Sequence, residues 1–516
     1  MDTQRAPAPG WRQWAGLTVL MLPTALLGLD VTALYLVVPS LAADLQPTAT
    51  ETLWIMDAYG FLIAGFLITM GTLGDRIGRR RLLMIGMAAF GAASVFAAFA
   101  TSAPLLIAAR ALLGVAGATL MPSTLSLISN MFTDARQRAS AIGLWATMFA
   151  LGMAAGPIVG GILVAHFWWG AVFLLAVPVS VATLVAAPAL LPEFRNDTSR
   201  LDLWSVALSL AALLPAIFAI KHAAAHGIDA QVLAAAALGG AGTITFVRRQ
   251  LRLREPLLDM RLFTDRSFSA ALSVLLIGLA GFGGVMYLVT QYLQFVDGLS
   301  PAAAGLWMGP PALAMLVGGI GAPMLAGRVS PGIVMAGTLA LSLIGYALLA
   351  VAGTNSVPAV VAGFGFVYLG LGVIAALGTE IVVSAAPSER SGSAAALSET
   401  VQELGIAAGV ALLGSLTTAV YRIMAQAPAD APAAVAESYT DSLPGAVSVT
   451  EQLPVEALRH AREAFTGGLN IAAIAAGIAV AGAAVVCLRQ LRHLAPIGAT
   501  GHSTEPIAST QGSDDR

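Results

Sequence analysis

The stretch AGLTVLMLPTALLGLDVTALYLVVP, residues 15–39, is a continuous apolar segment that contains one carboxylate, Asp30. It is long enough for an α-helix to cross the ~30 Å hydrocarbon core of a bilayer. A carboxylate inside such a helix costs several kcal/mol unless it is protonated, paired or hydrated. Leu, Val or Ala would make a more stable membrane anchor, so Asp30 is predicted to have a functional purpose.

The composition indicates that the whole chain, like residues 15–39, is suited to a membrane. Of its 516 residues 58% are hydrophobic and 10% are charged, whereas soluble proteins carry about 25% charged residues. Apolar segments recur from end to end, which indicates an all-α integral membrane protein. The single cysteine, Cys487, excludes an intrachain disulfide and a multi-cysteine metal site, and we expect it to be a packing residue.

The apolar segments predict fourteen membrane-spanning helices, arranged as two six-helix halves with two inserted helices between them. The predicted spans are 15–38, 52–73, 82–101, 104–128, 139–164, 169–191, 202–220, 231–247, 269–294, 302–326, 332–352, 357–384, 394–420 and 467–488. The corresponding domains are an N-terminal tail at 1–14, halves at 15–191 and 269–488, inserted helices at 202–247, a loop at 421–466 and a polar tail at 489–516.

Arginine placement predicts the orientation. If the N-terminus is cytoplasmic, most of the 26 basic residues fall in cytoplasmic segments, as the positive-inside rule requires. Both termini are then cytoplasmic and the 421–466 loop is outside. Two pairs of similar loops, FTDARQRASAIG with APSERSGSAAAL and LGDRIGR with LAGRVSP, favour an internal repeat. Repeated halves that flank a central cavity are a transporter architecture.

A glycine- and arginine-rich segment, GTLGDRIGRRR at residues 71–81, joins the second and third spans. Gly74 and Gly78 permit a tight turn, and Asp75 can accept hydrogen bonds from a helix start or from an arginine. The order resembles motif A of the major facilitator superfamily. That resemblance implies a conformational contact between the halves, made by Gly71, Gly74, Asp75, Arg76, Gly78 and Arg79.

Two further segments strengthen this resemblance. Arg110 lies about 9 Å inside span 4, within a sequence similar to motif B, which implies a place in the transport path and a link to proton transfer. Span 5 has closely spaced glycines that allow close helix approach and a proline that bends the helix. It resembles motif C, the antiporter signature, through Gly143, Gly152, Gly156, Pro157, Gly160 and Gly161.

With these motifs in place, GLDVTALYLVVP resembles the span 1 motif of fourteen-helix drug:proton antiporters, family 2 of this superfamily. Asp30, Thr32 and Pro39 match that motif, whereas Tyr35, Val37 and Val38 depart from it. The resemblance covers residues 12–422 and implies the major facilitator fold and export rather than uptake. It also implies that acids of spans 1 and 13 contribute to the recognition of cationic drugs and to coupling.

Other acids in the spans are candidate substrate or proton sites. Glu399 and Glu403 are four residues apart in span 13, so they share one helix face. Two anions there repel each other unless one is protonated or a cation lies between them. Asp57 in span 2 and Glu380 in span 12 are weaker candidates, each equally compatible with a structural role. Asp30 and Arg110 lie at similar depths, which predicts that they pair.

A cavity for large apolar cations also needs aromatic or methionine surfaces. The candidates, each more simply read as a packing or interface residue, are Trp54, Tyr59, Trp145, Tyr287, Tyr292, Trp307 and Met308. The chain has no G-x-x-x-x-G-K-[ST] phosphate-binding loop, and its only lysine is Lys221. No catalytic triad or metal cluster is evident. We therefore expect no enzyme activity and no cofactor, with energy taken from an ion gradient, which the resemblance to drug:proton antiporters implies is a proton gradient.

The sequence thus predicts a proton-coupled multidrug exporter in a bacterial inner membrane, with lipophilic cations and protons as its partners. The expected mechanism is alternating access, with no nucleic-acid partner, and the resemblance to transporters of this architecture implies a monomer. Three alternatives remain open: a dedicated exporter of one antibiotic or metabolite, an uptake symporter, and a non-transporting sensor or scaffold. The motif C pattern argues against uptake, and the buried charges argue against the scaffold.

Overall fold

The computed structural model describes residues 10–132, 135–194, 202–226, 229–253, 260–385, 391–428 and 430–496, and within these ranges all regular structure is helical. The first seven helices are α1 (Trp11–Leu45), α2 (Ala49–Ile77), α3 (Arg79–Ala98), α4 (Ala103–Met131), α5 (Ala135–His166), α6 (Ala171–Leu174) and α7 (Ala176–Leu190). They are followed by α8 (Leu203–His226) and α9 (Ala230–Arg252).

The second half begins with a 3-10 helix, Met260–Thr264, and includes a π-helical turn, Tyr292–Val296, at the end of its first long helix. Its longer helices are α10 (Arg266–Gln291), α11 (Pro301–Trp307), α12 (Gly309–Ala326), α13 (Pro331–Ala350), α14 (Val357–Ser384), α15 (Ser391–Met424) and α18 (Val455–Val486). Shorter elements are α16 (Ala433–Asp441), α17 (Leu443–Ser448), the 3-10 turn Thr450–Gln452 and the π-helical turn Cys487–Leu491.

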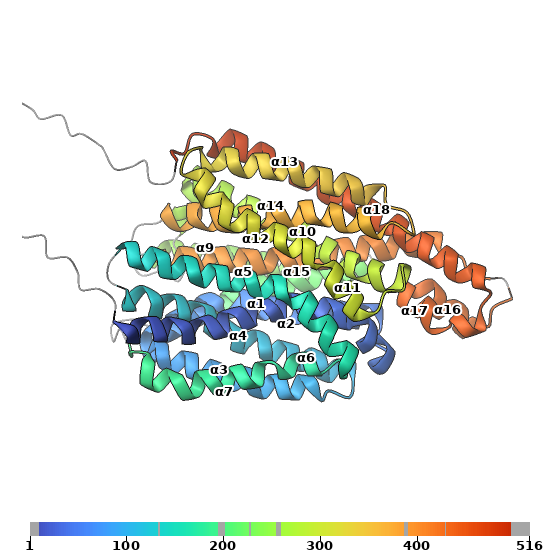
Figure 1. Cartoon of the computed structure of the whole chain (residues 1–516), viewed down its shortest axis with the longest axis horizontal. Coiled ribbons are helices and arrows are strands. Elements are labelled where there is room, and N and C mark those ends of the chain that lie inside the picture. The colour runs from blue at the N-terminus through green and yellow to red at the C-terminus, as the bar shows by residue number, and fades with distance from the viewer. Residues whose placement is uncertain are drawn as a thin grey trace, which may run out of the picture.

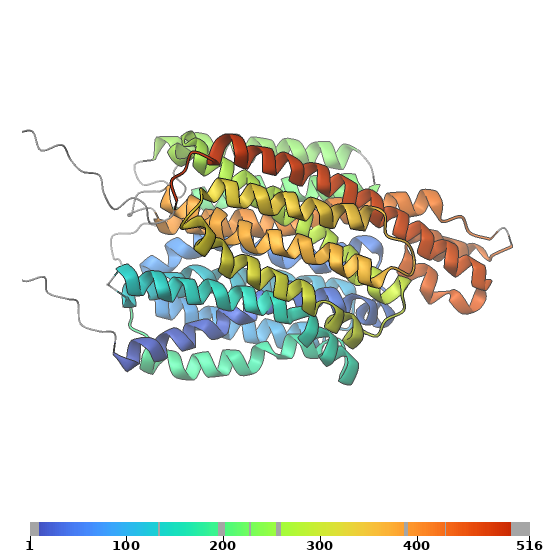
Figure 2. The ribbon, with the colours of Figure 1, turned by 45° about the horizontal axis from the view of Figure 1, so that its top comes forward.

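The helices form two bundles that lie side by side, one from α1 to α7 and the other from α10 to α18 (Figures 1 and 2). In the first bundle α1 packs on α5, α2 on α4, and α3 on α4 and α7. In the second, α10 packs on α15, α12 on α14, and α13 on α14 and α18. The two halves therefore share one packing order, which confirms the predicted fold class.

The described chain enters and leaves at the same end of the molecule, where α1 begins and α18 ends (Figure 1). This is the arrangement that an even number of crossings produces. At the opposite end, α16 and α17 project beyond the bundles (Figure 1). The inserted helices α8 and α9 pack on each other, and α8 also packs on α2 and α15, one helix from each half.

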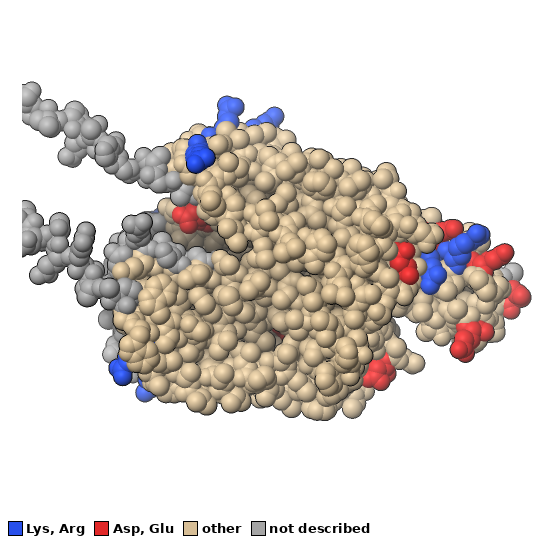
Figure 3. All heavy atoms as spheres, in the orientation of Figure 1, with Lys and Arg blue, Asp and Glu red and all other residues tan. Residues whose placement is uncertain are grey.

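The surface is that of a membrane protein. On the face shown in Figure 3, the charged side chains gather at the two ends and the middle is almost free of them. Twelve helices of the described chain are long and apolar enough to cross a membrane, and α2 and α8 contain the shorter apolar segments Ala58–Leu67 and Trp204–Ala216. The count of fourteen spans and the residue limits of the domains stay predictions.

Two spans differ in detail from the prediction. The tenth is divided into α11 and α12 at Met308, because Pro310 and Pro311 have no backbone N–H to donate. The last begins at Val455, within the predicted loop at 421–466. Its first turns place Ala457 and Ala461 inward while Arg459 is exposed. The extension is amphipathic, and its polar residues interrupt the continuous apolar segment from which the span was predicted.

The predicted loop region is therefore helical and closely packed. The Tyr421 hydroxyl of α15 donates to the Tyr439 carbonyl of α16 at 2.8 Å, and the Tyr439 hydroxyl donates to the Ala457 carbonyl of α18 at 2.9 Å. These two bonds connect three helices in sequence. The projecting helices are thus fixed to the C-terminal half.

The motif C glycines bring α5 against the part of α1 that carries Asp30. A Cβ at Gly152 would collide with the Ala25 carbonyl, and one at Gly156 would collide with the Thr32 hydroxyl. The Thr32 hydroxyl donates to the Met153 carbonyl at 2.8 Å, so a hydrogen bond also joins the two helices. The predicted close approach of span 5 is confirmed, and its partner is α1.

The adjoining face of α5 meets the other half. A Cβ at Gly161 would collide with the carbonyl of Pro301 on α11, and a Cβ at Gly305 would lie 2.6 Å from the carbonyl of Pro157. Further along this interface, the rings of Tyr35 on α1 and Tyr287 on α10 are 6.5 Å apart. The halves are therefore in close contact at the end where α11 lies, the end from which α16 and α17 project (Figure 1).

We expect the substitution Gly156→Ala to lower the melting temperature of the purified protein, since overpacking costs about 1–3 kcal/mol of folding free energy. Differential scanning fluorimetry in detergent measures this shift. Gly337→Ala on α13 is the matched control, because no atom lies within 4 Å of its added Cβ. Equal melting temperatures for the two variants would contradict the packing of α5 on α1 described above.

Candidate functional site

Asp30 and Arg110 form a buried ion pair inside the N-terminal half. Asp30 on α1 is 8% exposed and Arg110 on α4 is 2% exposed. The Arg110 Nη1 atom donates to the Asp30 Oδ2 atom at 2.8 Å, and the Arg110 Nε atom donates to the Ile55 carbonyl of α2 at 3.2 Å. The predicted pairing is confirmed, and it connects three helices.

Aromatic rings surround the guanidinium. The Arg110 Cζ atom lies 4.4 Å from the ring centroid of Tyr59 on α2 and 6.0 Å from that of Phe173 on α6. The quadrupole of each ring attracts the cation. The Tyr59 hydroxyl is buried and has no hydrogen-bond partner among the residues that the structure describes. Sequence reasoning proposed Tyr59 only as a drug-facing surface and missed its contact with Arg110.

Glu403 of α15 approaches this pair from the C-terminal half. Its side chain is buried, and a Cβ at Gly60 would lie 3.4 Å from the Glu403 Oε2 atom. Gly60 directly follows Tyr59, so Glu403 lies beside the same turn of α2. Glu403 interacts electrostatically with Asp30, Arg110 and Glu399. Glu399, one turn earlier on α15, is partly exposed.

The site thus has charges from both halves in one place. Asp30 and Arg110 neutralise each other, whereas Glu403 has no hydrogen bond or ion pair to another described residue. A buried carboxylate in this position can accept a proton or attract a cation. Within the described residues no group of three or more His, Cys, Asp or Glu side chains could hold a metal ion.

Of the other predicted acids, Glu380 has a described side chain. Glu380 is exposed near the end of α14. Asp57 and Asp75 are on α2, but their side chains are outside the described part of the structure. Their proposed roles stay predictions.

The motif A segment contacts the N-terminal half. α2 continues through Gly74 and ends at Ile77, so the turn is made by Gly78 alone, with φ of 107°. Glu193, which follows α7, accepts hydrogen bonds from the backbone N–H groups of Arg80 and Arg81 at 3.0 and 3.2 Å. This carboxylate caps α3. Sequence reasoning missed it because its partners are far away in the chain.

Several of the residues proposed as drug-binding surfaces make contacts within the fold. The Tyr292 hydroxyl donates to the Gly353 carbonyl and accepts from the Ser356 backbone N–H. Trp145 donates to the Thr124 hydroxyl at 3.0 Å. Met308 is buried and Trp307 is 40% exposed.

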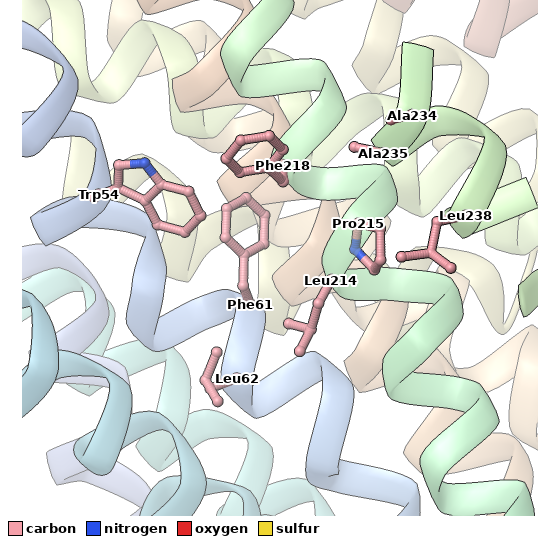
Figure 4. A pocket seen from close by; sticks show the side chains of 9 residues that line it. All are labelled: Trp54, Phe61, Leu62, Leu214, Pro215, Phe218, Ala234, Ala235 and Leu238. Atoms are coloured by element: carbon pink, nitrogen blue, oxygen red, sulfur yellow. The ribbon is translucent and has the colours of Figure 1, made fainter. Parts of the chain in front are cut away.

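An apolar cavity of about 530 Å³ lies between α2, α8 and α9. The rings of Trp54 and Phe61 from α2 and Phe218 from α8 gather at one side, and Leu238 of α9 lies at the other (Figure 4). Phe61 packs against Ala407 of α15. The cavity is therefore separate from the charged cluster but adjoins the same turn of α2.

Two repeated bundles of apolar helices define a polytopic membrane transporter, with a buried ion pair inside one half and a third carboxylate that approaches it from the other half. The profile of the Major Facilitator Superfamily matches residues 20–410, and the chain belongs to this family. It is 43% identical over 492 residues to the multidrug efflux pump LfrA of Mycolicibacterium smegmatis, covering 94% of this chain and 97% of that protein.

A second relative is the methyl viologen resistance protein SmvA of Salmonella typhimurium, 34% identical over 475 residues, covering 90% of this chain and 96% of that protein. The fold is similar to that of a solved bacterial homologue of the human lysosomal transporter Spinster, in an inward-facing and unoccupied conformation. That similarity has a TM-score of 0.64 at 15% identity and covers 94% of this chain and 98% of the other.

We expect Arg110→Met to destabilise the protein by about 3–5 kcal/mol, because it leaves the Asp30 charge buried and unpaired. The double substitution Asp30→Asn with Arg110→Met removes both charges, so it is expected to melt at a higher temperature than Arg110→Met alone. Arg459→Met is the control, since the Arg459–Glu463 pair is exposed and its N···O distance is 3.8 Å. If the double variant melts below Arg110→Met, the two charges do not compensate each other.

Proposed function

We propose that this protein is a proton-coupled exporter of lipophilic, cationic compounds across the bacterial inner membrane. The observation that carries the proposal is the approach of the Glu403 carboxylate, which has no ion-pair partner within the described part of the chain, to the neutralised Asp30–Arg110 pair. The relatives named as a multidrug efflux pump and a methyl viologen resistance protein support export.

The charge arrangement gives Glu403 the central role. With Asp30 and Arg110 paired, their net charge is zero, so the attraction for a cation comes from Glu403, with Glu399 one turn away. When Glu403 is ionised, it attracts a lipophilic cation. When it is protonated, that attraction is lost and the cation is released. Proton and drug therefore compete for one carboxylate.

The number of protons decides which part of the gradient is used. One proton moved inward for one monovalent cation moved outward is electroneutral, and only the pH difference drives it, at about 1.4 kcal/mol per pH unit. A second proton adds the membrane potential, about 2.3 kcal/mol per 100 mV. Asp30 and Glu399 are candidate carriers of a second proton.

The basic residues support a cytoplasmic location for the end at which α1 begins. In that orientation, the contacts of Gly161 with Pro301 and of Gly305 with Pro157 lie on the outer side. The halves are then closed toward the outside, and the conformation is the one that loads substrate from the cytoplasm. Rocking of the halves would open this contact and release the compound outside.

We expect inverted vesicles that contain the protein to accumulate ethidium and a quaternary ammonium compound only while a proton gradient is present. Addition of an uncoupler should abolish this transport. Persistence of transport after the gradient has collapsed would overturn the proposed coupling. Transport of one compound out of a broad panel would favour the dedicated exporter instead.

In the same assay, Glu403→Gln should abolish gradient-driven transport, since an amide neither ionises nor exchanges a proton. Glu437→Gln on α16 is the matched control, because Glu437 is exposed and distant from the cluster. Glu403→Gln vesicles that still concentrate ethidium at the wild-type rate would remove Glu403 from the mechanism.

A further inference from the structure

Tyr59 lies between the two sets of charges, and its surroundings are unusual for a buried tyrosine. Its ring contacts the Arg110 guanidinium at 4.4 Å, and its hydroxyl has no partner among the described residues. The hydroxyl interacts electrostatically with both Asp30 and Glu403. Buried polar groups are nearly always hydrogen-bonded. A buried hydroxyl that interacts with two carboxylates, and that has no bonding partner within the described structure, indicates a group that has a partner in another state.

One glycine on α4 and one on α2 allow close approach to this turn of α2 from both sides. On one side, a Cβ at Gly114 of α4 would lie 2.5 Å from the Tyr59 carbonyl, so α4 touches the backbone of α2 one turn beyond Arg110. On the other side, Gly60 leaves room for the Glu403 carboxylate of α15. Arg110 and Glu403 therefore approach consecutive residues of the same turn from opposite halves.

Arg110 in this position has two possible anionic partners. Its present partner is Asp30, within the same half. If Asp30 is protonated, the guanidinium loses its counter-charge in a buried site, and Glu403 is the acid whose electrostatic interaction with Arg110 crosses to the other half. The ring of Tyr59 can hold a guanidinium through this exchange, since cation–π attraction does not require one fixed donor direction.

We propose that Tyr59 is a positioning residue that lets Arg110 exchange Asp30 for Glu403, and that its hydroxyl bonds to Asp30 once Arg110 has left. Asp30 takes up the proton and, as a neutral acid, donates to the Tyr59 oxygen. The new Arg110–Glu403 pair joins α4 of one half to α15 of the other. Protonation on one half is thereby converted into a contact between halves.

The link between this exchange and transport rests on the proposed function. The partner exchange itself can be tested without transport. Asp30→Asn imitates the protonated acid. In that background Arg110 depends on Glu403, so adding Glu403→Gln should lower the melting temperature at least twice as much as Glu403→Gln does in the wild-type background. An equal shift in both backgrounds overturns the exchange, whatever the protein transports.

The role of Tyr59 is separated from simple packing by two substitutions. Tyr59→Phe retains the ring and removes the hydroxyl, and Tyr59→Leu removes both. We expect Tyr59→Phe to keep ethidium counterflow, measured without a gradient, while gradient-driven uptake falls about tenfold, the loss expected for one hydrogen bond to a buried acid. Tyr59→Leu should lose both activities. Tyr368→Phe, which removes a buried hydroxyl bonded to the Met286 sulfur in the C-terminal half, should match the wild type.

The pH dependence of uptake provides a further test of the Tyr59 hydroxyl. The charged groups that act on Tyr59 are Asp30 on α1, Arg110 on α4 and Glu403 on α15, and Glu403 in turn interacts with Glu399. Tyr59→Phe should shift the uptake profile along the pH axis, because a neutral Asp30 loses its acceptor. A Tyr59→Phe profile that superimposes on the wild type removes the hydroxyl from the mechanism. Absence of any gradient-driven uptake by the wild type would instead remove the proposed function and leave the melting experiment as the test of the exchange.

Discussion

The ion pair between Asp30 and Arg110 is the interaction on which the N-terminal half depends. In a medium without water, neither charge is stable alone, so the pair requires α1 and α4 to remain in register. Arg110 also bonds to the Ile55 carbonyl and contacts the Tyr59 ring, which adds α2. The glycines of α5 then bring that helix against the same part of α1. Four helices are thus arranged around one pair of charges.

At the equivalent position of the C-terminal half, the helices are held together by different contacts. Arg110 lies seven residues after the first residue of α4, Ala103, and Phe364 lies seven residues after the first residue of α14, Val357. Phe364 stacks with Phe282 of α10, with ring centroids 6.2 Å apart, and Tyr368 meets both rings at 4.6 and 5.0 Å. One half therefore holds its matching helices with ionisable groups, and the other holds them with aromatic rings. Of these two contacts, the Asp30–Arg110 ion pair is the one that protonation of a carboxylate can break.

Depth along a helix could be predicted from the sequence, whereas direction around the helix axis could not. Asp30 and Arg110 were placed at similar depths by counting residues at 1.5 Å each, and their pairing followed. The same count gave no information on which neighbour Glu403 faces, because that depends on how the two halves are docked. The contacts of Tyr59 and Glu193 were missed because their partners lie on other helices of the same half, and helix-to-helix packing within a half is not given by depth. Glycine spacing predicted a close contact of α5 but not its two partners, α1 and α11.

The position of α8 has a consequence for how the halves can move. The interface between the halves has two sides, one where α2 meets α15 and one where α5 meets α11 and α12, and α8 packs on both helices of the first side. A helix that contacts both walls resists their separation, so the covered side acts as the axis and the opposite side opens more widely. In the proposed rocking cycle, lipid that borders α5, α11 and α12 would rearrange each time, while the lipid around α8 and α9 would stay in place. The two inserted helices would make the rocking motion asymmetric within the plane of the membrane.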